Sequence, residues 1–116
     1  MAAASINTKI ARQDLASARD RITAQVRTAF DRMVSSGQIL TLAQQTARVA
    51  EEQATAEREK FDLGAAVYLQ VKEAEEEARK AKLRFTQART DAAKAGIELA
   101  HLTGELLAQP SLRRVR

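Results

Sequence analysis

A heptad pattern in the second half of the chain limits the fold more than any other feature. Stepping alternately four and three residues forward from Val67, all twelve positions reached are apolar: Val67, Val71, Ala74, Ala78, Ala81, Phe85, Ala88, Ala92, Ala95, Leu99, Leu102 and Leu106. An apolar spacing of 3.5 residues kept over about six heptads is the seam of a left-handed supercoiled helix. The pattern therefore predicts a long helix that packs along another helix.

The same spacing runs through the first half of the chain. Ten of twelve positions are apolar in the series Ile22, Val26, Ala29, Met33, Ser36, Leu40, Ala43, Ala47, Ala50, Ala54, Glu57 and Phe61. Ala11, Leu15 and Ala18 extend this stripe upstream. Gly64 lies between the two halves, and glycine at the end of a helical pattern predicts a reversal. Two long helices joined there would run antiparallel.

The expected fold is therefore all-α, a long antiparallel coiled-coil hairpin of two helices that reverse near Gly64. Its expected parts are a disordered start at 1–4, a helix at 5–62, a turn at 62–65, a helix at 66–108 and a basic tail at 109–116. At 1.5 Å per residue the first helix would be about 87 Å long, which predicts a rod rather than a globule.

The segment Ser35-Ser36-Gly37 offers an alternative fold. Glycine costs about 1 kcal/mol relative to alanine inside a helix, so Gly37 could mark a turn between two shorter helices of a three-helix bundle. However, the seam keeps its phase through Ser36, which favours one continuous or mildly kinked helix.

The composition argues against an enzyme and against a metal or cofactor site. With no cysteine and the single histidine His101, the chain has neither the ligands of a zinc site nor a Ser-His-Asp triad. The glutamates of residues 73–77 are too nearly consecutive on a helix to surround one ion. We therefore expect no catalytic residue, no metal ligand and no cofactor.

Charge and hydropathy give further expectations about partners. No stretch approaches the roughly 20 consecutive apolar residues of a membrane-spanning helix, and the first residues lack the pattern of a signal peptide. The net charge is +4, and residues 1–50 carry seven Lys and Arg against three Asp. Because tryptophan is absent and aromatic residues make up 3%, no base-stacking surface accompanies this charge, and we expect no nucleic acid partner.

Two segments resemble a known family. Residues 58–71 (REKFDLGAAVYLQV) place an aromatic residue and a leucine before a glycine and a Tyr/Leu/Val pattern after it. About 40 residues later, residues 99–106 (LAHLTGEL) end the returning helix with a leucine and a glycine. In order and spacing over residues 45–107, these elements resemble the outer membrane efflux (TolC-like) family.

The resemblance implies a homotrimer in which each protomer adds two such hairpins to a twelve-helix periplasmic tunnel, standing on an outer-membrane β-barrel. Such channels export small molecules or proteins with a periplasmic adaptor (membrane fusion) protein and an inner-membrane transporter. The glycine turn would be the periplasmic tip that contacts the adaptor, formed by Arg58, Phe61, Leu63, Gly64, Ala65 and Val67. Gln70 and Glu73 would lie where some members have acidic residues that constrict the entrance. The implied location is the periplasmic portion of the cell outer membrane.

Several departures from the family pattern accompany this resemblance. The sequence shows no signal peptide, second repeat or β-strands, so we interpret it as one hairpin of such a channel, and either repeat is possible. Ala66 and Val67 stand where some members have an arginine and a serine or threonine, so a similar ion-pair gate is not expected. The alternative is a free-standing helical-bundle scaffold or interaction protein, cytoplasmic if the chain is complete.

Overall fold

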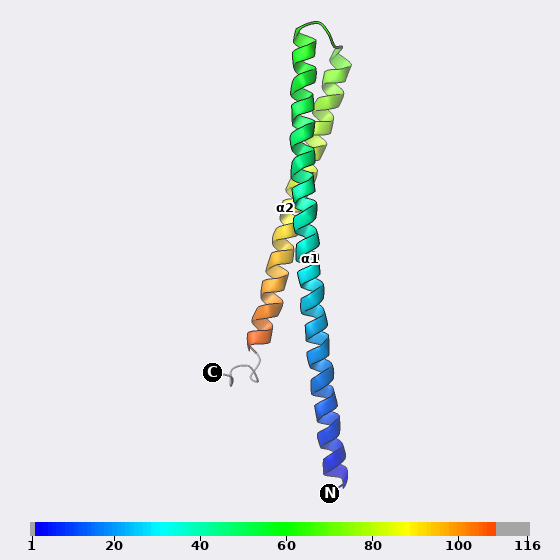
Figure 1. Ribbon diagram of the computed structural model, residues 1–116, viewed down its shortest axis with the longest axis vertical. Helices are drawn as coiled ribbons and strands as arrows, with labels where there is room; N and C mark the ends of the chain where they lie inside the picture. Colours follow the sequence, from blue (N-terminus) through cyan, green and yellow to red (C-terminus); the bar gives the residue numbers. More distant parts are fainter. Residues whose placement is uncertain (1, 109–116) are drawn as a thin grey trace.

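The computed structural model describes residues 2–108, with side chains for residues 2–104, and consists of two helices in an antiparallel hairpin (Figure 1). Helix α1 spans Ala2–Asp62 and helix α2 spans Tyr68–Ala108. The molecule measures 93 × 28 × 13 Å along its principal axes. Within residues 2–108 there is no strand, and neither helix has the length and hydropathy needed to cross a membrane. The expected all-α hairpin is confirmed.

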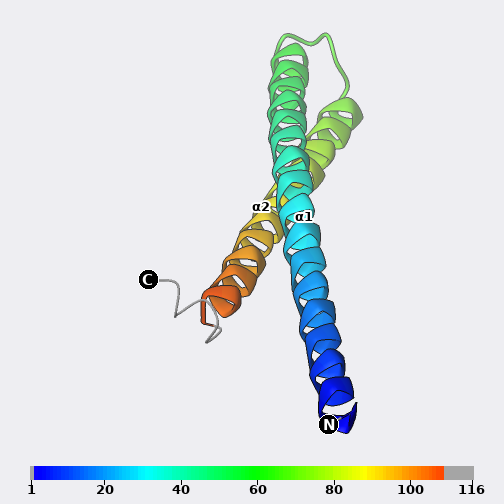
Figure 2. The same ribbon diagram turned by 60° about the horizontal axis from the view of Figure 1, so that its bottom comes forward.

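Helix α1 continues without a break through Gly37 (Figure 2). The alternative of a turn at Ser35-Ser36-Gly37 and a three-helix bundle is therefore wrong. The heptad seam explains why, because the apolar positions on both sides of Gly37 face the same partner helix. Tertiary packing of an apolar face supplies most of the stability of a helix in a protein and outweighs the cost of about 1 kcal/mol for one glycine.

The helix boundaries differ from those expected at two places. Helix α1 begins at Ala2 rather than at residue 5, so residues 2–4, which we expected to be disordered, are helical. They are alanines, which have the highest helix propensity. Helix α2 begins at Tyr68 rather than at residue 66, because residues 63–67 are all used by the turn. The basic tail expected at 109–116 lies outside the described residues.

The seam predicted from the heptad pattern is where the two helices bury their side chains. Five residues in the part of the chain with described side chains are buried, and all of them are seam positions: Ala29 (2% exposed), Val71 (5%), Ala81 (2%), Ala88 (5%) and Ala95 (3%). Four of the five are alanines, whose small side chains let two helices approach closely but remove little apolar area from water. The hairpin therefore has a long, thin core with little apolar area per turn.

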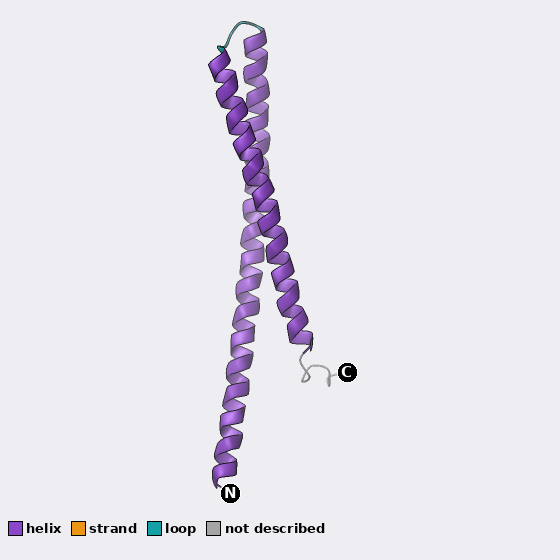
Figure 3. Cartoon of the chain, turned by 180° about the vertical axis from the view of Figure 1, so that it is seen from behind, coloured by secondary structure: helices purple, strands orange, loops and turns teal. Residues whose placement is uncertain are grey.

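Two grooves between the helices show their register. Each groove is lined from both helices, one by Ala29 with Leu102 and the other by Ala43 with Ala88. Ser36 lies seven residues from both Ala29 and Ala43, and Ala95 lies seven residues from both Leu102 and Ala88. In an antiparallel pair Ser36 therefore lies opposite Ala95, midway between these two grooves. The N-terminal part of α1 extends beyond the end of α2 (Figure 3). For this reason Leu15, a stripe position that we expected to pack, is 56% exposed.

Two ion pairs join the helices on their surface. Arg32 Nη1 lies 2.9 Å from Glu98 Oε2, and Arg58 Nη2 pairs with Glu75 Oε1. All four side chains are more than 40% exposed, and exposed ion pairs typically contribute 0–1 kcal/mol, about a tenth of a typical folding free energy at most. They therefore add to the choice of register more than to stability.

Candidate functional site at the helical tip

The turn that joins the helices is a Schellman motif centred on Gly64. The Ala65 N–H donates to the Lys60 carbonyl (2.7 Å) and the Gly64 N–H donates to the Phe61 carbonyl (2.9 Å), the two hydrogen bonds that define this motif. Gly64 has φ of 75°, in the left-handed region that glycine adopts without the steric cost of a Cβ. The sequence signal for a reversal at Gly64 therefore corresponds to a specific backbone geometry.

Helix α2 begins with a partial capping box. The Gln70 N–H donates to the Val67 carbonyl (3.1 Å), and the Val67 N–H donates to the Gln70 side-chain oxygen (3.4 Å). A Gln side chain at the third helical position that accepts from the N-cap N–H satisfies one of the donors left unpaired at a helix start. Gln70, which we expected in an entrance constriction, thus also caps α2.

Two aromatic rings close the turn from opposite helices. The Phe61 and Tyr68 ring centroids are 6.0 Å apart and the rings are inclined at 54°, a tilted arrangement within the favourable range for aromatic pairs. Lys72 Nζ lies 5.7 Å from the centroid of the Tyr68 ring. These contacts hold the last turn of α1 against the first turn of α2, so the tip has a defined shape.

The outer surface of the tip is apolar and exposed. Leu63 is 85% exposed, the highest value among the large hydrophobic residues that the structure describes, and Val67 and Leu69 are 62% and 63% exposed. A single exposed leucine on a protein surface is ordinary, but a cluster of them at one end of a rod is a candidate contact surface for another protein. The chemistry of this surface suits burial of apolar area rather than catalysis.

The six residues expected at the tip occupy different environments. Phe61, Leu63, Gly64, Ala65 and Val67 all lie in or beside the turn. Arg58 lies one turn farther down α1, and its guanidinium is paired with Glu75 of α2. It therefore joins the two helices, and its charge is partly neutralised there.

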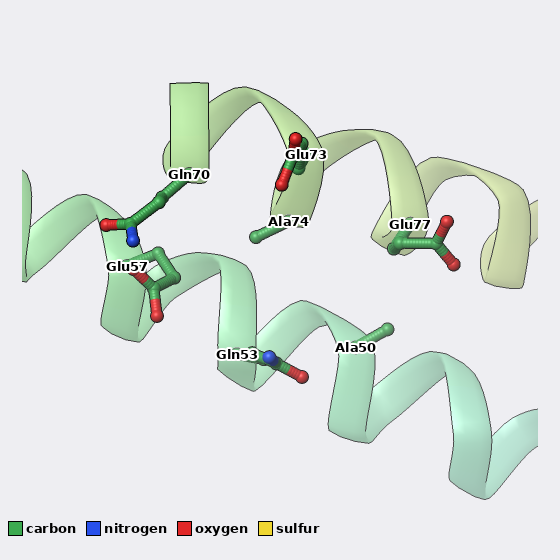
Figure 4. A pocket seen from close by; sticks show the side chains of 7 residues that line it. All are labelled: Ala50, Gln53, Glu57, Gln70, Glu73, Ala74 and Glu77. Atoms are coloured by element: carbon green, nitrogen blue, oxygen red, sulfur yellow. The ribbon is translucent and has the colours of Figure 1, made fainter. Parts of the chain in front are cut away.

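A polar groove lies just below the turn, between the two helices (Figure 4). It has a volume of about 310 Å³ and is lined by Ala50, Gln53, Glu57, Gln70, Glu73, Ala74 and Glu77. The two residues expected at a constriction, Gln70 and Glu73, are thus brought together. Figure 4 shows the Gln70 side chain pointing toward Glu57 of the opposite helix. Among the described residues no group of acidic or histidine side chains is arranged to hold a metal ion.

Glu57 is a charged residue on the apolar stripe near the turn. Its side chain is only 20% exposed. Lys60 Nζ lies 3.4 Å from Glu57 Oε1 and partly compensates this charge. With Glu73 and Glu77, Glu57 gives the groove an acidic character.

Near the groove, Arg79 pairs with Glu76 on the same helix. Arg79 donates hydrogen bonds to Glu76 Oε1 (2.6 Å) and Oε2 (3.1 Å), which lower the pKa of the Glu76 carboxyl below its usual value and raise the pKa of Arg79. Because the pKa of Glu76 is lower in the folded chain than in the unfolded chain, the pair stabilises the fold while the Glu76 carboxyl is ionised. This stabilisation is lost as the pH falls through the lowered pKa of Glu76 and the carboxyl takes up a proton.

Sequence reasoning missed two residues that shape the tip, Tyr68 and Glu75. Tyr68 was seen only as part of a family-like pattern, although an aromatic residue seven positions after Phe61 across a glycine turn is a usable signal for a ring contact. Glu75 enters the sequence argument only as one of the glutamates of residues 73–77 that cannot surround one ion. No spacing rule within one helix could have paired it with Arg58, because the contact crosses between helices.

The left-handed geometry at Gly64 gives a stability prediction. We expect Gly64→Ala to lower the free energy of unfolding by about 1 kcal/mol, because a Cβ is disfavoured at positive φ. No atom lies within 4 Å of the new Cβ, so the cost is that of the backbone alone. The control is Gly37→Ala, which has equally open surroundings but lies inside α1 and should raise stability by about 1 kcal/mol. Thermal unfolding of both variants measures the two effects, and equal signs would contradict the assigned turn.

Comparison with known families gives a match that covers most of the chain. The family model described as outer membrane efflux protein matches residues 1–105. This range includes both helices up to the last turn of α2 and the whole tip. Neither the curated proteins nor the solved structures contain a match.

Proposed function

Because the chain belongs to the outer membrane efflux protein family, we propose that it forms one helical hairpin of the periplasmic tunnel of an outer-membrane efflux channel. The observation that carries this proposal is the family match over residues 1–105, which coincides with a single rod-like hairpin. Members of this family are efflux channels rather than enzymes, and they belong to the outer membrane.

The outward faces of the helices support assembly with further helices. On the side of α2 away from the seam, Leu83 and Ile97 are 66% and 70% exposed, and on α1 Leu42 and Val49 are 64% and 56% exposed. A helix that is apolar on two sides packs between two neighbours. In the proposed homotrimer these faces contact neighbouring hairpins, and the many-helix tunnel supplies the burial that the alanine-rich seam lacks.

The tip is proposed to contact the periplasmic adaptor protein, which couples the channel to an inner-membrane transporter. Leu63 and Val67 supply apolar area to the proposed contact. Gly64 and Ala65 have small side chains that allow close approach of a partner backbone. Phe61 supports the turn through its ring contact with Tyr68. Arg58 is proposed at the edge of this contact, where its pairing with Glu75 holds it. Gln70 and Glu73, with Glu57, are proposed to line the tunnel entrance and to favour cationic over anionic solutes there.

Site-specific crosslinking in the full-length channel tests the adaptor contact. We expect a cysteine at Phe61 or Val67, modified with a short bifunctional crosslinker, to capture the adaptor in cells that express both proteins. The control is a cysteine at Gln45, which is exposed near the middle of α1 and should capture no adaptor. Capture failing at both tip positions would overturn the proposed contact. A compact monomer that melts cooperatively without partners would instead favour a free-standing scaffold.

A further inference from the structure

Each helix of the hairpin has an interior glycine at nearly the same level. The register places Ser36 of α1 opposite Ala95 of α2, between the groove that includes Ala29 and Leu102 and the groove that includes Ala43 and Ala88. The next residue along each helix is a glycine, Gly37 in α1 and Gly96 in α2. Glycine is the weakest helix former other than proline. It therefore occurs once in each helix at positions that lie within one helical turn of each other along the hairpin.

Close packing does not explain these two glycines. A Cβ built on either Gly37 or Gly96 would meet nothing within 4 Å. Alanine would therefore fit at both positions and would form a stronger helix. Since neither helix needs the space, the property that distinguishes glycine here is its backbone freedom.

The neighbours of Gly37 weaken α1 further at this level. Ser35 and Ser36 precede it, and sharp bends in helices are found at Gly/Ser pairs. The Thr41 hydroxyl donates to the Gly37 carbonyl at 3.1 Å, a kind of bond that Thr55 and Thr86 also make, but here the acceptor is a glycine. A threonine hydroxyl that bonds to the carbonyl four residues back competes with the helical hydrogen bond and often bends the helix.

An ion pair between the helices lies on each side of this level. Arg32 pairs with Glu98 toward the open end of the hairpin, and Arg58 pairs with Glu75 toward the tip. Each half of the hairpin therefore has an ion pair that joins its two helices. The segment between the halves contains two glycines and two serines. This arrangement lets the two halves bend relative to each other while each keeps its own pairing.

We propose that Gly37 and Gly96 form a hinge at which the tip half, residues 38–95, bends as a unit relative to the rest of the hairpin. Such a hinge moves the tip sideways without separating the seam. In the channel it would let the tip follow its adaptor, a consequence that rests on the proposed function. The hinge itself is a property of the isolated chain and can be tested without an adaptor.

Distances between pairs of spin labels measure the bending directly. The chain has no cysteine, so cysteines can be introduced in pairs without a background. The pair Ala24→Cys and Gln45→Cys spans the hinge, and the control pair Gln38→Cys and Glu59→Cys lies on its tip side. All four positions are exposed on α1, and both pairs are three heptads apart, about 32 Å along the helix. We expect a broader distance distribution for the pair that spans the hinge.

Replacing both glycines by alanine should remove this difference. In the double variant Gly37→Ala and Gly96→Ala, we expect the distribution across the hinge to narrow to the width of the control pair. Amide exchange near both positions should slow about fivefold per replaced glycine, as the difference in helix propensity implies. The matched variant is Gly104→Ala, in which the added Cβ also meets nothing within 4 Å. Gly104 has no glycine opposite it on α1, so this variant should leave the distance distribution across the hinge broad. The hinge would be overturned if the two label pairs gave distance distributions of equal width in the parent chain, or if Gly104→Ala narrowed the distribution as much as the double variant does. Failure of adaptor crosslinking would not affect this conclusion.

Discussion

Replacing Ala81 by aspartate is expected to lower the free energy of unfolding by about 3 kcal/mol, because a buried charge without a partner is costly. Ala81 is 2% exposed at the centre of the seam, where the helices meet through small side chains. A carboxylate there is held between the helices, where it loses most of its hydration. Because the hairpin has few large buried side chains, this loss should remove most of the helix content of the isolated chain.

The matched control for this prediction is Ala93→Asp. Ala93 lies on the same helix but is exposed, so the substitution has the same cost in helix propensity, about 0.5 kcal/mol, without burial of the charge. Circular dichroism as a function of temperature measures both variants. Similar unfolding of the two variants would show that the seam identified here is not the surface that holds the helices together.

Replacing Leu63 by glutamine is expected to weaken adaptor binding by about ten- to a hundredfold without changing the stability of the hairpin. Burial of a leucine side chain contributes about 1.5–3 kcal/mol, and Leu63 is 85% exposed in the free chain. Most of that area is therefore available to a partner, and little of it supports the fold. The affinity of the full-length channel for its adaptor, and export by cells carrying the variant, measure the effect.

The control at the same position is Leu63→Met, which keeps an apolar side chain of similar volume and should retain most of the affinity. Thermal unfolding of both variants should match the parent chain, because neither side chain contacts the seam. Full affinity in Leu63→Gln would place the adaptor contact elsewhere on the hairpin.

Much of the fold could be predicted because a coiled coil encodes its packing in its spacing. Among the described residues, all five that are buried belong to the two series of seam positions. The seam also keeps its phase through the half-buried Ser36, as the continuity of α1 requires. The reversal at Gly64 was predictable because few residues other than glycine adopt a left-handed conformation after a helix. The helix ends were less predictable, because the cost of adding or removing one terminal turn is small.

The details of the tip were harder to predict, because they depend on contacts between the helices. The pairing of Arg58 with Glu75 requires the register of the two helices, which the pattern along one helix does not contain. The low exposure of the Glu57 side chain follows from the polar groove that it shares with Gln70 and Glu73 of the other helix. A pattern along one helix gives the face on which a residue lies but not the residue that it meets.

A structure of the full-length channel by electron cryomicroscopy, determined without an adaptor, tests the proposed role most directly. Residues 2–108 should then form one helical hairpin within the periplasmic tunnel, with Gly64 at its far end and with Leu83 and Ile97 packed against neighbouring helices. If these residues instead formed a compact bundle outside the tunnel wall, or if Gly64 lay inside a continuous helix, the assignment of this chain as a tunnel hairpin would be wrong.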